Sequence, residues 1–575
     1  MFQRSLVAVL IMLGVGGCAT QDTGGDYAPI LSSLRSEFIS LEKDGPLYRS
    51  YLAATQAQQD EQHKKSAAFF LEALRSDPTS QVIADKAFFE LLLAGHLDAA
   101  TALAENIATD FDRDENDLVR LMYVLQAYKN EDWPAVRDRL ANQKSDGFSY
   151  IFAPLLTAWS YAAEGNFPAA ETALTPFNDD KRLKPLAQEH AAYMLDYLGE
   201  YDAARVRYEQ VTSEMPPVSL QPVVAYAHLL YRHGEKKLAL SFLAKQALRF
   251  DSPPFLLRQG RVIAGGGTPN NIATTPIKAG GAIFFRLANE LSQGRAQKAA
   301  ILYARIASYL TPEHSNIHIL LARLLERAGN VNAAADALAQ VGETNEARGY
   351  ADIRRVEVLQ AAGKNKLAEK LSRELLIKAP RNPQLLLGLG DLLRLRQADA
   401  EALVYYSRAI ASLNKPNELN WVAYFARAMA YEKLGDWQRA EHDLKAALNI
   451  SPEEPALLNY LGYSWIERGT HIPRAKAMIE KAAAIKPDDG FITDSLGWVY
   501  FLTADYGAAV ITLEKAVRLE PGDVTINDHL GDAYWKVGRQ IEARFQWRHA
   551  LDSGAKDKER ALILAKLDAG LLEAS

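Results

Sequence analysis

The chain has 575 residues, which is too long for one compact hydrophobic core, so we expect several domains or a stacked array of repeats. Helix-forming residues such as Ala, Leu, Glu and Lys recur throughout and alternating Val/Ile/Thr-rich stretches are nearly absent, which argues against a sheet domain. The net charge of -6 and the lack of clustered Lys and Arg argue against nucleic acid as a partner.

The first 17 residues are expected to be a cleaved signal peptide. Arg4 supplies a positive start, Leu6 to Leu13 form a short apolar run, and Val15-Gly16-Gly17-Cys18 ends the run with small residues. The apolar run is too short to span a bilayer, which needs about 20 residues. The pattern resembles a bacterial lipoprotein signal, which implies cleavage just before Cys18.

Cys18 is the only cysteine in the chain, which excludes an intramolecular disulfide and a metal site built from several cysteines. The resemblance implies that Cys18 carries lipid after cleavage, and several acyl chains together give stable membrane anchoring. Ala19 follows in place of aspartate, which in similar lipoproteins of enteric bacteria goes with export to the outer membrane. We therefore expect an outer-membrane protein that is lipid-anchored and faces the periplasm.

Three segments are expected to follow the signal. Residues 18–47 should hold the lipidated cysteine and a flexible tether rich in Gly, Asp, Thr and Gln. Residues 48–259 are predicted to form degenerate N-terminal copies of the helical repeat that is described next. Turn-forming Gly, Pro, Asn and Thr then cluster in residues 260–281, which predicts an irregular connector between two solenoid halves.

A repeat of 34 residues runs through residues 282–555 and is clearest near the end of the chain. Small residues lie where two helices must approach closely, and large apolar residues fill the space between them. The period is that of the tetratricopeptide repeat (TPR), a helical hairpin that stacks on its neighbours. The recurring set is Leu496, Gly497, Tyr500, Ala509, Leu513 and Ala516, which returns as Leu530, Gly531, Tyr534, Ala543, Trp547 and Ala550.

These copies and weaker ones upstream predict an all-α TPR superhelical solenoid of about fourteen helical hairpins. Residues 556–575 are predicted to form a capping helix that covers the last open repeat face. The apolar residues expected to cover that face lie at helical spacing, at Leu562, Leu564, Leu567 and Leu571 or Leu572.

Signatures of catalysis are missing from the sequence. There is no HExxH, no CxxC, no P-loop and no GxGxxG after a strand, so we predict no metal, no cofactor and no catalytic residues, and expect that the chain is not an enzyme. Gly462-Tyr463-Ser464 begins like a nucleophile elbow, but it lies inside a predicted repeat helix where the strained turn cannot form.

In TPR proteins the first helix of each repeat lines a concave groove. The resemblance therefore implies a partner-binding groove in the last three repeats, formed by Asn459, Tyr463, Phe491, Asp494, Trp498, Phe501, Asp528, Asp532 and Trp535. Because other large residues already fill the core positions, we expect the aromatic residues of this set to be exposed for recognition. Only Lys536 lies near Asp528 and Asp532 in sequence, so basic or aromatic segments should be favoured and free carboxylates repelled.

The runs Asn459 to Ser464, Asp494 to Tyr500 and Asp528 to Trp535 resemble a bacterial family of large outer-membrane TPR lipoproteins. The resemblance implies a non-catalytic adaptor that brings a periplasmic carboxy-terminal processing protease together with client proteins such as peptidoglycan hydrolases. Two alternatives stay open, because fold does not fix function. One is an envelope assembly or secretion-system lipoprotein, and the other is an enzyme hidden in the N-terminal half.

Overall fold

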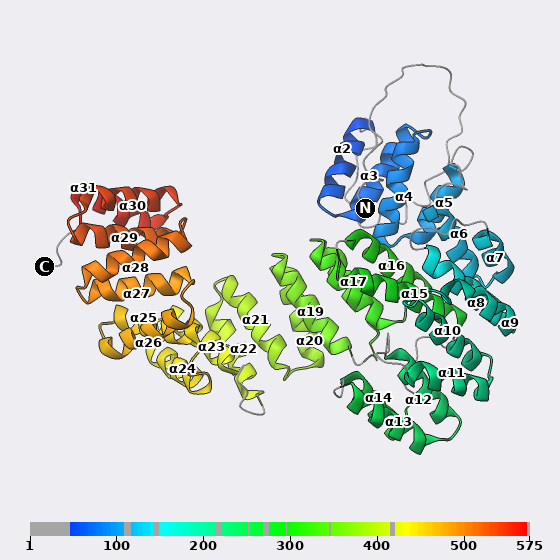
Figure 1. The fold of residues 1–575 in the computed structure, drawn as a ribbon. Coiled ribbons are helices and arrows are strands. Elements are labelled where there is room, and N and C mark those ends of the chain that lie inside the picture. The colour runs from blue at the N-terminus through cyan, green and yellow to red at the C-terminus, as the bar shows by residue number, and fades with distance from the viewer. Residues whose placement is uncertain are drawn as a thin grey trace. The chain divides into compact units, whose positions relative to one another are not determined.

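The computed structural model describes residues 47–107, 117–141, 149–213, 220–250, 254–267, 275–294, 296–343, 345, 347–413 and 420–571. Cys18, the predicted signal peptide and nearly all of the predicted tether lie outside these residues. Within them the chain forms thirty α-helices, α2 to α31, one short 3-10 turn and no strand. In chain order the helices make fourteen consecutive pairs, with α14 and α31 left over, which confirms the predicted all-α TPR solenoid (Figure 1).

The chain divides into two compact units, residues 1–358 and 359–575, and α19 (Arg348–Ala361) contains the boundary. The helices of the first unit are α2 (Leu47–Gln59), α3 (His63–Ser76), α4 (Gln81–Ala94), α5 (Leu97–Ile107), α6 (Asp117–Lys129), α7 (Trp133–Ala141), α8 (Ser149–Ala163), α9 (Phe167–Ala173), α10 (Lys184–Tyr197), α11 (Tyr201–Ser213), α12 (Gln221–Arg232), α13 (Lys236–Arg249), α14 (Pro254–Ala264), α15 (Pro276–Leu291), α16 (Gln297–Leu310), α17 (Ser315–Arg327) and α18 (Val331–Ala339).

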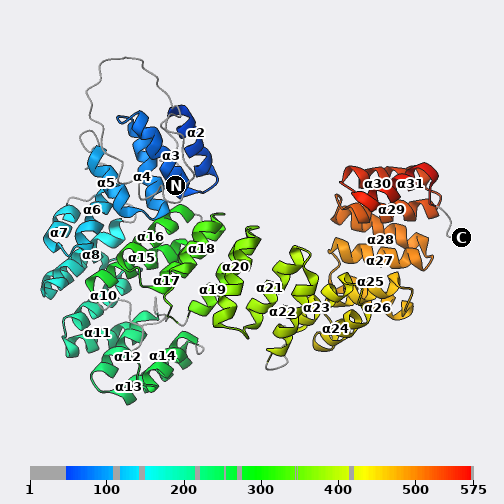
Figure 2. The ribbon, with the colours of Figure 1, turned by 180° about the vertical axis from the view of Figure 1, so that it is seen from behind.

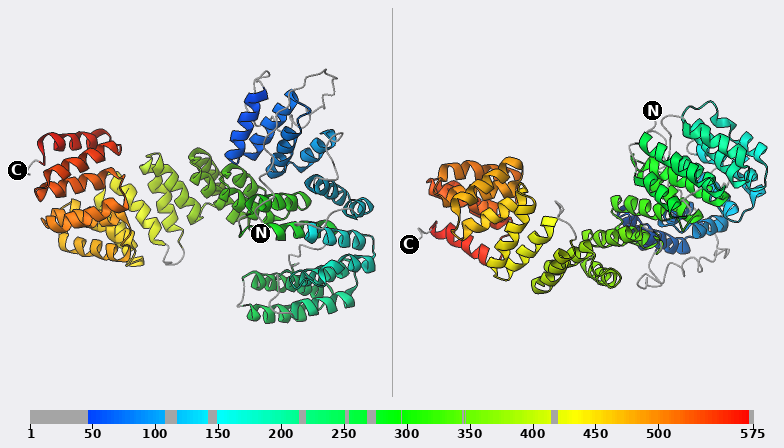
Figure 3. Two further views of the ribbon diagram at one scale, coloured as in Figure 1. Left: turned by 45° about the horizontal axis from the view of Figure 1, so that its top comes forward. Right: turned by 90° about the horizontal axis from the view of Figure 1, so that it is seen from below.

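The second unit is a plain stack of hairpins in chain order (Figures 1 and 3). Its helices are α20 (Asn365–Lys378), α21 (Pro383–Leu395), α22 (Asp399–Ala411), α23 (Trp421–Lys433), α24 (Trp437–Ile450), α25 (Pro455–Glu467), α26 (Ile472–Ile485), α27 (Gly490–Leu502), α28 (Tyr506–Leu519), α29 (Val524–Lys536), α30 (Gln540–Asp552) and α31 (Asp557–Ala569).

A tight turn joins the two helices of most hairpins, and in thirteen of them a described residue of the turn takes a positive φ. In the last hairpin this residue is Gly538, with φ of 83°, and the following N–H of Arg539 donates to the carbonyl of Tyr534 at 2.9 Å. The left-handed conformation is cheap for glycine and costs other residues about 1 kcal/mol or more. Residues in this conformation recur at or near the 34-residue period in both units, at Glu61, Gly95, Glu131, Gly165, Gly199, Gly234, Gly329, Gly363, Gln397, Gly435, Gly469, Ala504 and Gly538.

Glycines inside the first helix of a repeat allow its partner helix to pack closely. A Cβ atom placed on Gly531 would lie 2.5 Å from the Trp547 ring, and one placed on Gly497 would lie 2.5 Å from Leu513 Cγ. Both distances are far below van der Waals contact, so a side chain there would force the two helices apart. The structure thus supports the spacing role assigned to these glycines from the repeat.

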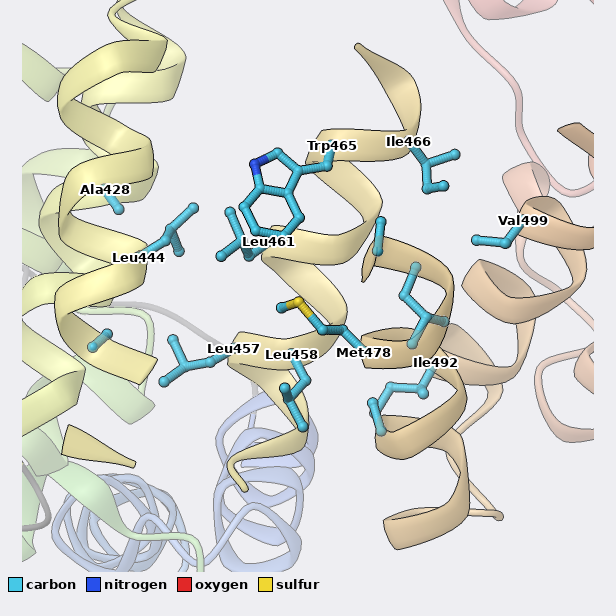
Figure 4. Packing of buried hydrophobic residues seen from close by; sticks show 14 of the residues in the cluster. Ala428, Leu444, Leu457, Leu458, Leu461, Trp465, Ile466, Met478, Ile492 and Val499 are labelled. Carbon is cyan, nitrogen blue, oxygen red and sulfur yellow. The ribbon is translucent and has the colours of Figure 1, made fainter. Parts of the chain in front are cut away.

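The core of the second unit is continuous from repeat to repeat. One cluster surrounds the fully buried ring of Trp465, with Leu444, Leu461 and Ile479 among its buried members (Figure 4). A second cluster surrounds Trp547 in the last hairpin. Each repeat therefore buries its apolar face only against its neighbours, as expected for a solenoid.

The first unit differs from a plain stack because its later helices pack against its earlier ones. Helix α15 packs against α8, and α16 packs against α4 (Figures 1 and 2). Arg305 Nε donates to the carbonyl of Leu93 at 3.1 Å, Tyr128 Oη donates to the carbonyl of Pro276 at 2.8 Å, and Arg286 pairs with Glu189 at 3.1 Å. Residues about 100 to 200 positions apart are thereby joined directly.

The predicted connector at 260–281 is wrong in extent and in role. Helices α14 and α15 occupy both ends of it, and the helices that follow it still belong to the first unit. Gly280 and Gly281, at the end of the predicted connector, lie in α15, where a Cβ on Gly280 would come within 2.8 Å of the Tyr128 ring and one on Gly281 within 2.4 Å of Thr311 Oγ1. They are glycines because neighbouring helices pack against them, not because the chain turns.

The predicted capping helix is present as α31, and two residues of its predicted buried face, Leu567 and Leu571, pack on the last core cluster. Leu562 and Leu564 were assigned wrongly, because both are exposed and Ile563 between them is fully buried. Ile563 and Leu567 are spaced four residues apart and so share one face of the helix.

Candidate protein-binding surface

Helices α25, α27 and α29 are the first helices of the last three repeats and carry all nine predicted groove residues. The starting points of α27 and α29 are fixed by capping side chains. Asp489 accepts from the N–H groups of Phe491 and Ile492 at 3.1 Å, and Asp523 accepts from the N–H of Ile526 at 3.0 Å. Because an N-cap fixes where a helix begins, it also fixes which side chains share each face.

The ring of Trp498 lies at the centre of this surface. It stacks on Phe501 at 4.7 Å and on His529 at 3.9 Å, and its Nε1 donates to Glu467 at 2.9 Å. Three successive first helices are thus joined through one indole ring. Trp498 is half-buried, so part of its area supports the fold and part faces solvent.

His529 and Asp494 form a buried pair beneath Trp498. The Nδ1 atom of His529 lies 3.0 Å from both carboxylate oxygens of Asp494, and both residues are buried. Burial acts to lower the pKa of His529, but the Asp494 carboxylate and the charges of Asp528 and Asp532 outweigh it and raise the pKa above the ordinary value. Asp494 was predicted to be exposed for recognition; it is instead a partner of this histidine inside the fold.

The raised pKa predicts that the C-terminal repeats lose stability as pH rises. Because the pKa of His529 is higher in the folded chain than in the unfolded chain, where it is about 6.5, its protonation stabilises the fold. This stabilisation is complete below about pH 6.5 and is lost as the pH rises through the pKa of the folded chain. The gap in urea midpoint between the native chain and His529→Phe, which keeps a ring against Trp498, should therefore narrow from pH 6 upward. A gap that stays constant to pH 9 would show that the pair carries no charge.

Asp528 and Asp532 share a cation from outside the predicted set. Lys566 on α31 lies 2.7 Å from Asp528 and 2.8 Å from Asp532, and Trp547 Nε1 donates to Asp532 at 2.9 Å. Asp532 is only 3% exposed. Lys566 reduces the negative charge of this site, so the charge that would repel a free carboxylate or attract a basic segment is smaller than the two aspartates alone imply.

Trp535 lies beneath the end of α31. Its ring is 5.5 Å from that of Trp547, and a Cβ atom on Gly570 would come within 2.0 Å of Trp535 Cζ2. Only a residue without a side chain fits at position 570. The helix that closes the last repeat thus also covers Trp535, which is half-buried rather than open to a partner.

The remaining residues of the predicted set differ in their exposure. Phe491 is 56% exposed and lies two helical turns before Trp498 on the same face of α27. Tyr463 is half-buried, and burial together with the charges of Glu467 and Asp494 raises its pKa. Asn459 is half-buried, and its Oδ1 atom is enclosed without a hydrogen-bond partner among the described residues.

Tyr463, Phe491, Trp498 and Phe501 therefore form what we call the aromatic face. The sequence pattern missed three residues that shape it, namely Glu467, His529 and Lys566. Glu467 follows Tyr463 by four residues on one helix, a spacing that could have indicated contact. No local signal connects Lys566 with residues on α29.

No group of three or more His, Cys, Asp or Glu side chains within the described ranges is arranged to hold a metal ion. Every helix in those ranges is too short or too polar to cross a bilayer.

Comparison with known proteins points to the same repeat. Family models of the tetratricopeptide repeat match residues 353–415, 421–454 and 495–523. A TPR repeat-containing protein of Pseudomonas aeruginosa is 31% identical over 185 residues, which cover 32% of this chain and 30% of that protein. The chain thus spans less than a third of the length of this curated relative.

Several solved structures resemble parts or most of the chain. The APC/C hetero-tetramer Cut9-Hcn1 contains a chain that is similar over 96% of this chain and all of its own length, with 14% identity and a TM-score of 0.39. The thermophilic TPR protein TTC0263 of Thermus thermophilus is similar over 32% of this chain and 99% of its own, with 24% identity and a TM-score of 0.28.

The family matches fall on helix pairs that the fold shows independently. The match at 421–454 contains α23 and α24, and the match at 495–523 contains most of α27 and all of α28. Sequence models and helix pairing therefore agree that residues 353–523 contain tetratricopeptide repeats, within an all-α solenoid of helix pairs.

Proposed function

We propose that this chain is a non-catalytic adaptor that is lipid-anchored at the outer membrane and faces the periplasm. In this proposal it brings a carboxy-terminal processing protease together with client proteins such as peptidoglycan hydrolases. The signal pattern that ends at Cys18 and the repeat runs in α25, α27 and α29 are the features that suggest this role.

The aromatic face is the observation that supports protein binding most directly. Phe491 exposes more than half of its surface, and Trp498 and Phe501 form a stacked pair beside it. Large aromatic side chains on a pre-formed surface are typical anchors of protein interfaces. Because Lys566 compensates part of the charge of Asp528 and Asp532 and the exposed side chains here are aromatic, we expect the bound segment to be mainly apolar or aromatic.

Anchoring is expected to depend on Cys18. Replacement of Cys18 by serine removes the thiol that would carry lipid, so the variant should appear in the soluble fraction after cell lysis. Membrane fractionation with mass spectrometry of the mature N-terminus measures this. A Cys18→Ser chain that stays with the outer membrane without an acyl chain would show that the anchor lies elsewhere.

Binding is expected to centre on the aromatic face. Phe491→Ala should weaken capture of the protease or its client by about tenfold, because loss of an interface anchor costs more than about 1 kcal/mol. Phe545→Ala is a matched control, since Phe545 is 62% exposed but lies on α30, the second helix of its repeat. Both variants should melt like the native chain, because substitutions at exposed sites shift stability by only about 0.5 kcal/mol.

The adaptor role is tested by adding the chain to a cognate periplasmic protease and a shared client. The chain alone should cleave nothing, and it should increase the rate at which the protease degrades the client. Phe491→Ala should reduce this increase and Phe545→Ala should not. Equal degradation rates with and without the chain would contradict the adaptor role and favour an envelope assembly or secretion lipoprotein, which a pull-down of secretin or barrel components would identify.

A further inference from the structure

The first unit contains a cavity of about 460 Å³ at the place where its later helices meet its earlier ones. The walls come from the start of α3, the turn between α4 and α5, and helices α16, α17 and α18. Two long-range hydrogen bonds hold these walls together. Arg305 Nε donates to the carbonyl of Leu93, and Asn330 Nδ2 donates to the carbonyl of Glu61 at 2.6 Å.

Arg305 is the main charge in this cavity. Its Nε atom bonds to a backbone carbonyl, and no carboxylate lies within ion-pair distance of its guanidinium group among the described residues. Burial lowers the pKa of Arg305 to about 10, although the charge of Asp336 acts to raise it, and the group is still charged at neutral pH. A partly desolvated guanidinium with no carboxylate in direct contact is costly, and such groups usually have a closer counter-charge.

The rest of the lining is also suited to a negative charge. Lys64 and Lys65 line the cavity in the first turn of α3, and Asn332 and Ala333 line it in the first turn of α18. Helix N-termini carry a partial positive charge that attracts anions, and in α18 the N–H of Ala333 already donates to Asn330 Oδ1 at 3.2 Å. Asp336 is the only acidic residue in the lining.

The neighbouring acids Glu61 and Glu90 are directed to another residue. His63, which also lines the cavity, lies 3.0 Å from Glu61 and 2.9 Å from Glu90 through its two ring nitrogens. His318 lines the opposite side, and its Nε2 lies 2.6 Å from the carbonyl of Pro312. Among the lining residues, Asp336 is therefore the one carboxylate that offsets the charges of Arg305 and Lys65.

We propose that this cavity binds a small molecule through an oxyanion group, either a phosphate or a carboxylate, with Arg305 as the direct contact. A guanidinium group presents parallel N–H donors that match two oxygens of either group. The volume admits a small organic anion rather than a folded partner. This site lies in the first unit, and its function does not depend on the aromatic face.

The test is calorimetric titration of the purified full chain with inorganic phosphate and, separately, with citrate, at matched ionic strength. The proposal expects a Kd below about 1 mM for at least one of the two anions, and the two titrations show whether phosphate or carboxylate is preferred. Arg305→Gln should weaken that Kd by at least about tenfold, because hydrogen bonds to a charged group are lost. Lys65→Gln, an exposed lining residue, should weaken it by about threefold.

Arg137→Gln is the control, because Arg137 is a half-buried arginine of the first unit that lies outside the cavity and pairs with Glu164. It should leave the Kd unchanged. If circular dichroism shows that Arg305→Gln does not fold, the proposal is tested by the Kd of the Lys65→Gln variant. Absence of binding by both anions, or an unchanged Kd in the folded lining variants, would overturn the proposal.

Discussion

Replacement of Lys566 by methionine is expected to lower the free energy of unfolding of the C-terminal repeats by about 3 kcal/mol. The ammonium group of Lys566 lies between Asp528 and Asp532, and these three side chains are only 20%, 19% and 5% exposed. Burial raises the pKa of Asp532, and Lys566 opposes that rise. Without the cation, two neighbouring carboxylates would be left buried and unpaired, which is the costly case for an ion pair.

Urea denaturation followed by tryptophan fluorescence measures this loss, since Trp535 and Trp547 lie beside the site. Lys481→Met is the matched control. Lys481 pairs with Glu453 at 2.9 Å, but the two side chains are 46% and 78% exposed, so the change should stay within about 0.5 kcal/mol. Equal effects of the two substitutions would show that α31 does not hold the carboxylates in solution.

Two glycines in α21 are expected to respond to alanine in opposite ways. A Cβ atom on Gly390 would lie 2.4 Å from Cε1 of the fully buried Tyr406, whereas one on Gly388 would meet nothing within 4 Å. Gly390→Ala should therefore lower the free energy of unfolding by about 1 to 3 kcal/mol, through overpacking. Gly388→Ala should raise it by up to about 1 kcal/mol, because alanine is the better helix former.

Thermal melting measures the stability of the two variants. Because both substitutions are Gly→Ala changes in the same helix, each variant is a control for the other. The hydroxyl of Tyr406 also donates to Asp391 at 2.8 Å, so any movement of the ring disturbs a hydrogen bond as well. A Gly390→Ala chain as stable as the native one would mean that α21 and α22 pack less closely than the structure shows.

The 34-residue spacing predicted the repeat, the hairpins and the small contact positions of the second unit, because each of these depends on residues close in sequence. The degenerate repeats of the first unit were predicted only coarsely. Their turns take the same positive φ as later ones, and in both units some of these positions carry another residue than glycine, as at Glu61 and Glu131 in the first unit and Gln397 and Ala504 in the second. A backbone conformation can be kept after its most suitable residue is lost.

Contacts between distant segments could not be predicted in the same way. The repeat register placed Asp494, Asp528 and Asp532 on the first helices correctly, but it could not show that His529 and Lys566 neutralise them. Likewise, the glycines of α15 were placed in a connector because the sequence around them does not show what packs on them. The ring of Tyr128, which packs on Gly280, lies some 150 residues earlier. That the nine predicted groove residues of α25, α27 and α29 bind a partner is still a prediction.

The packing of α15 against α8 and of α16 against α4 changes how the first unit can fold. A linear solenoid can form its repeats one after another and can lose terminal repeats singly. Here Arg305 bonds to Leu93 across 212 residues, so a long loop must close before that contact forms, at an entropic cost that grows with the logarithm of loop length. The first unit should therefore form late and break cooperatively, whereas the second unit can fray repeat by repeat from its end.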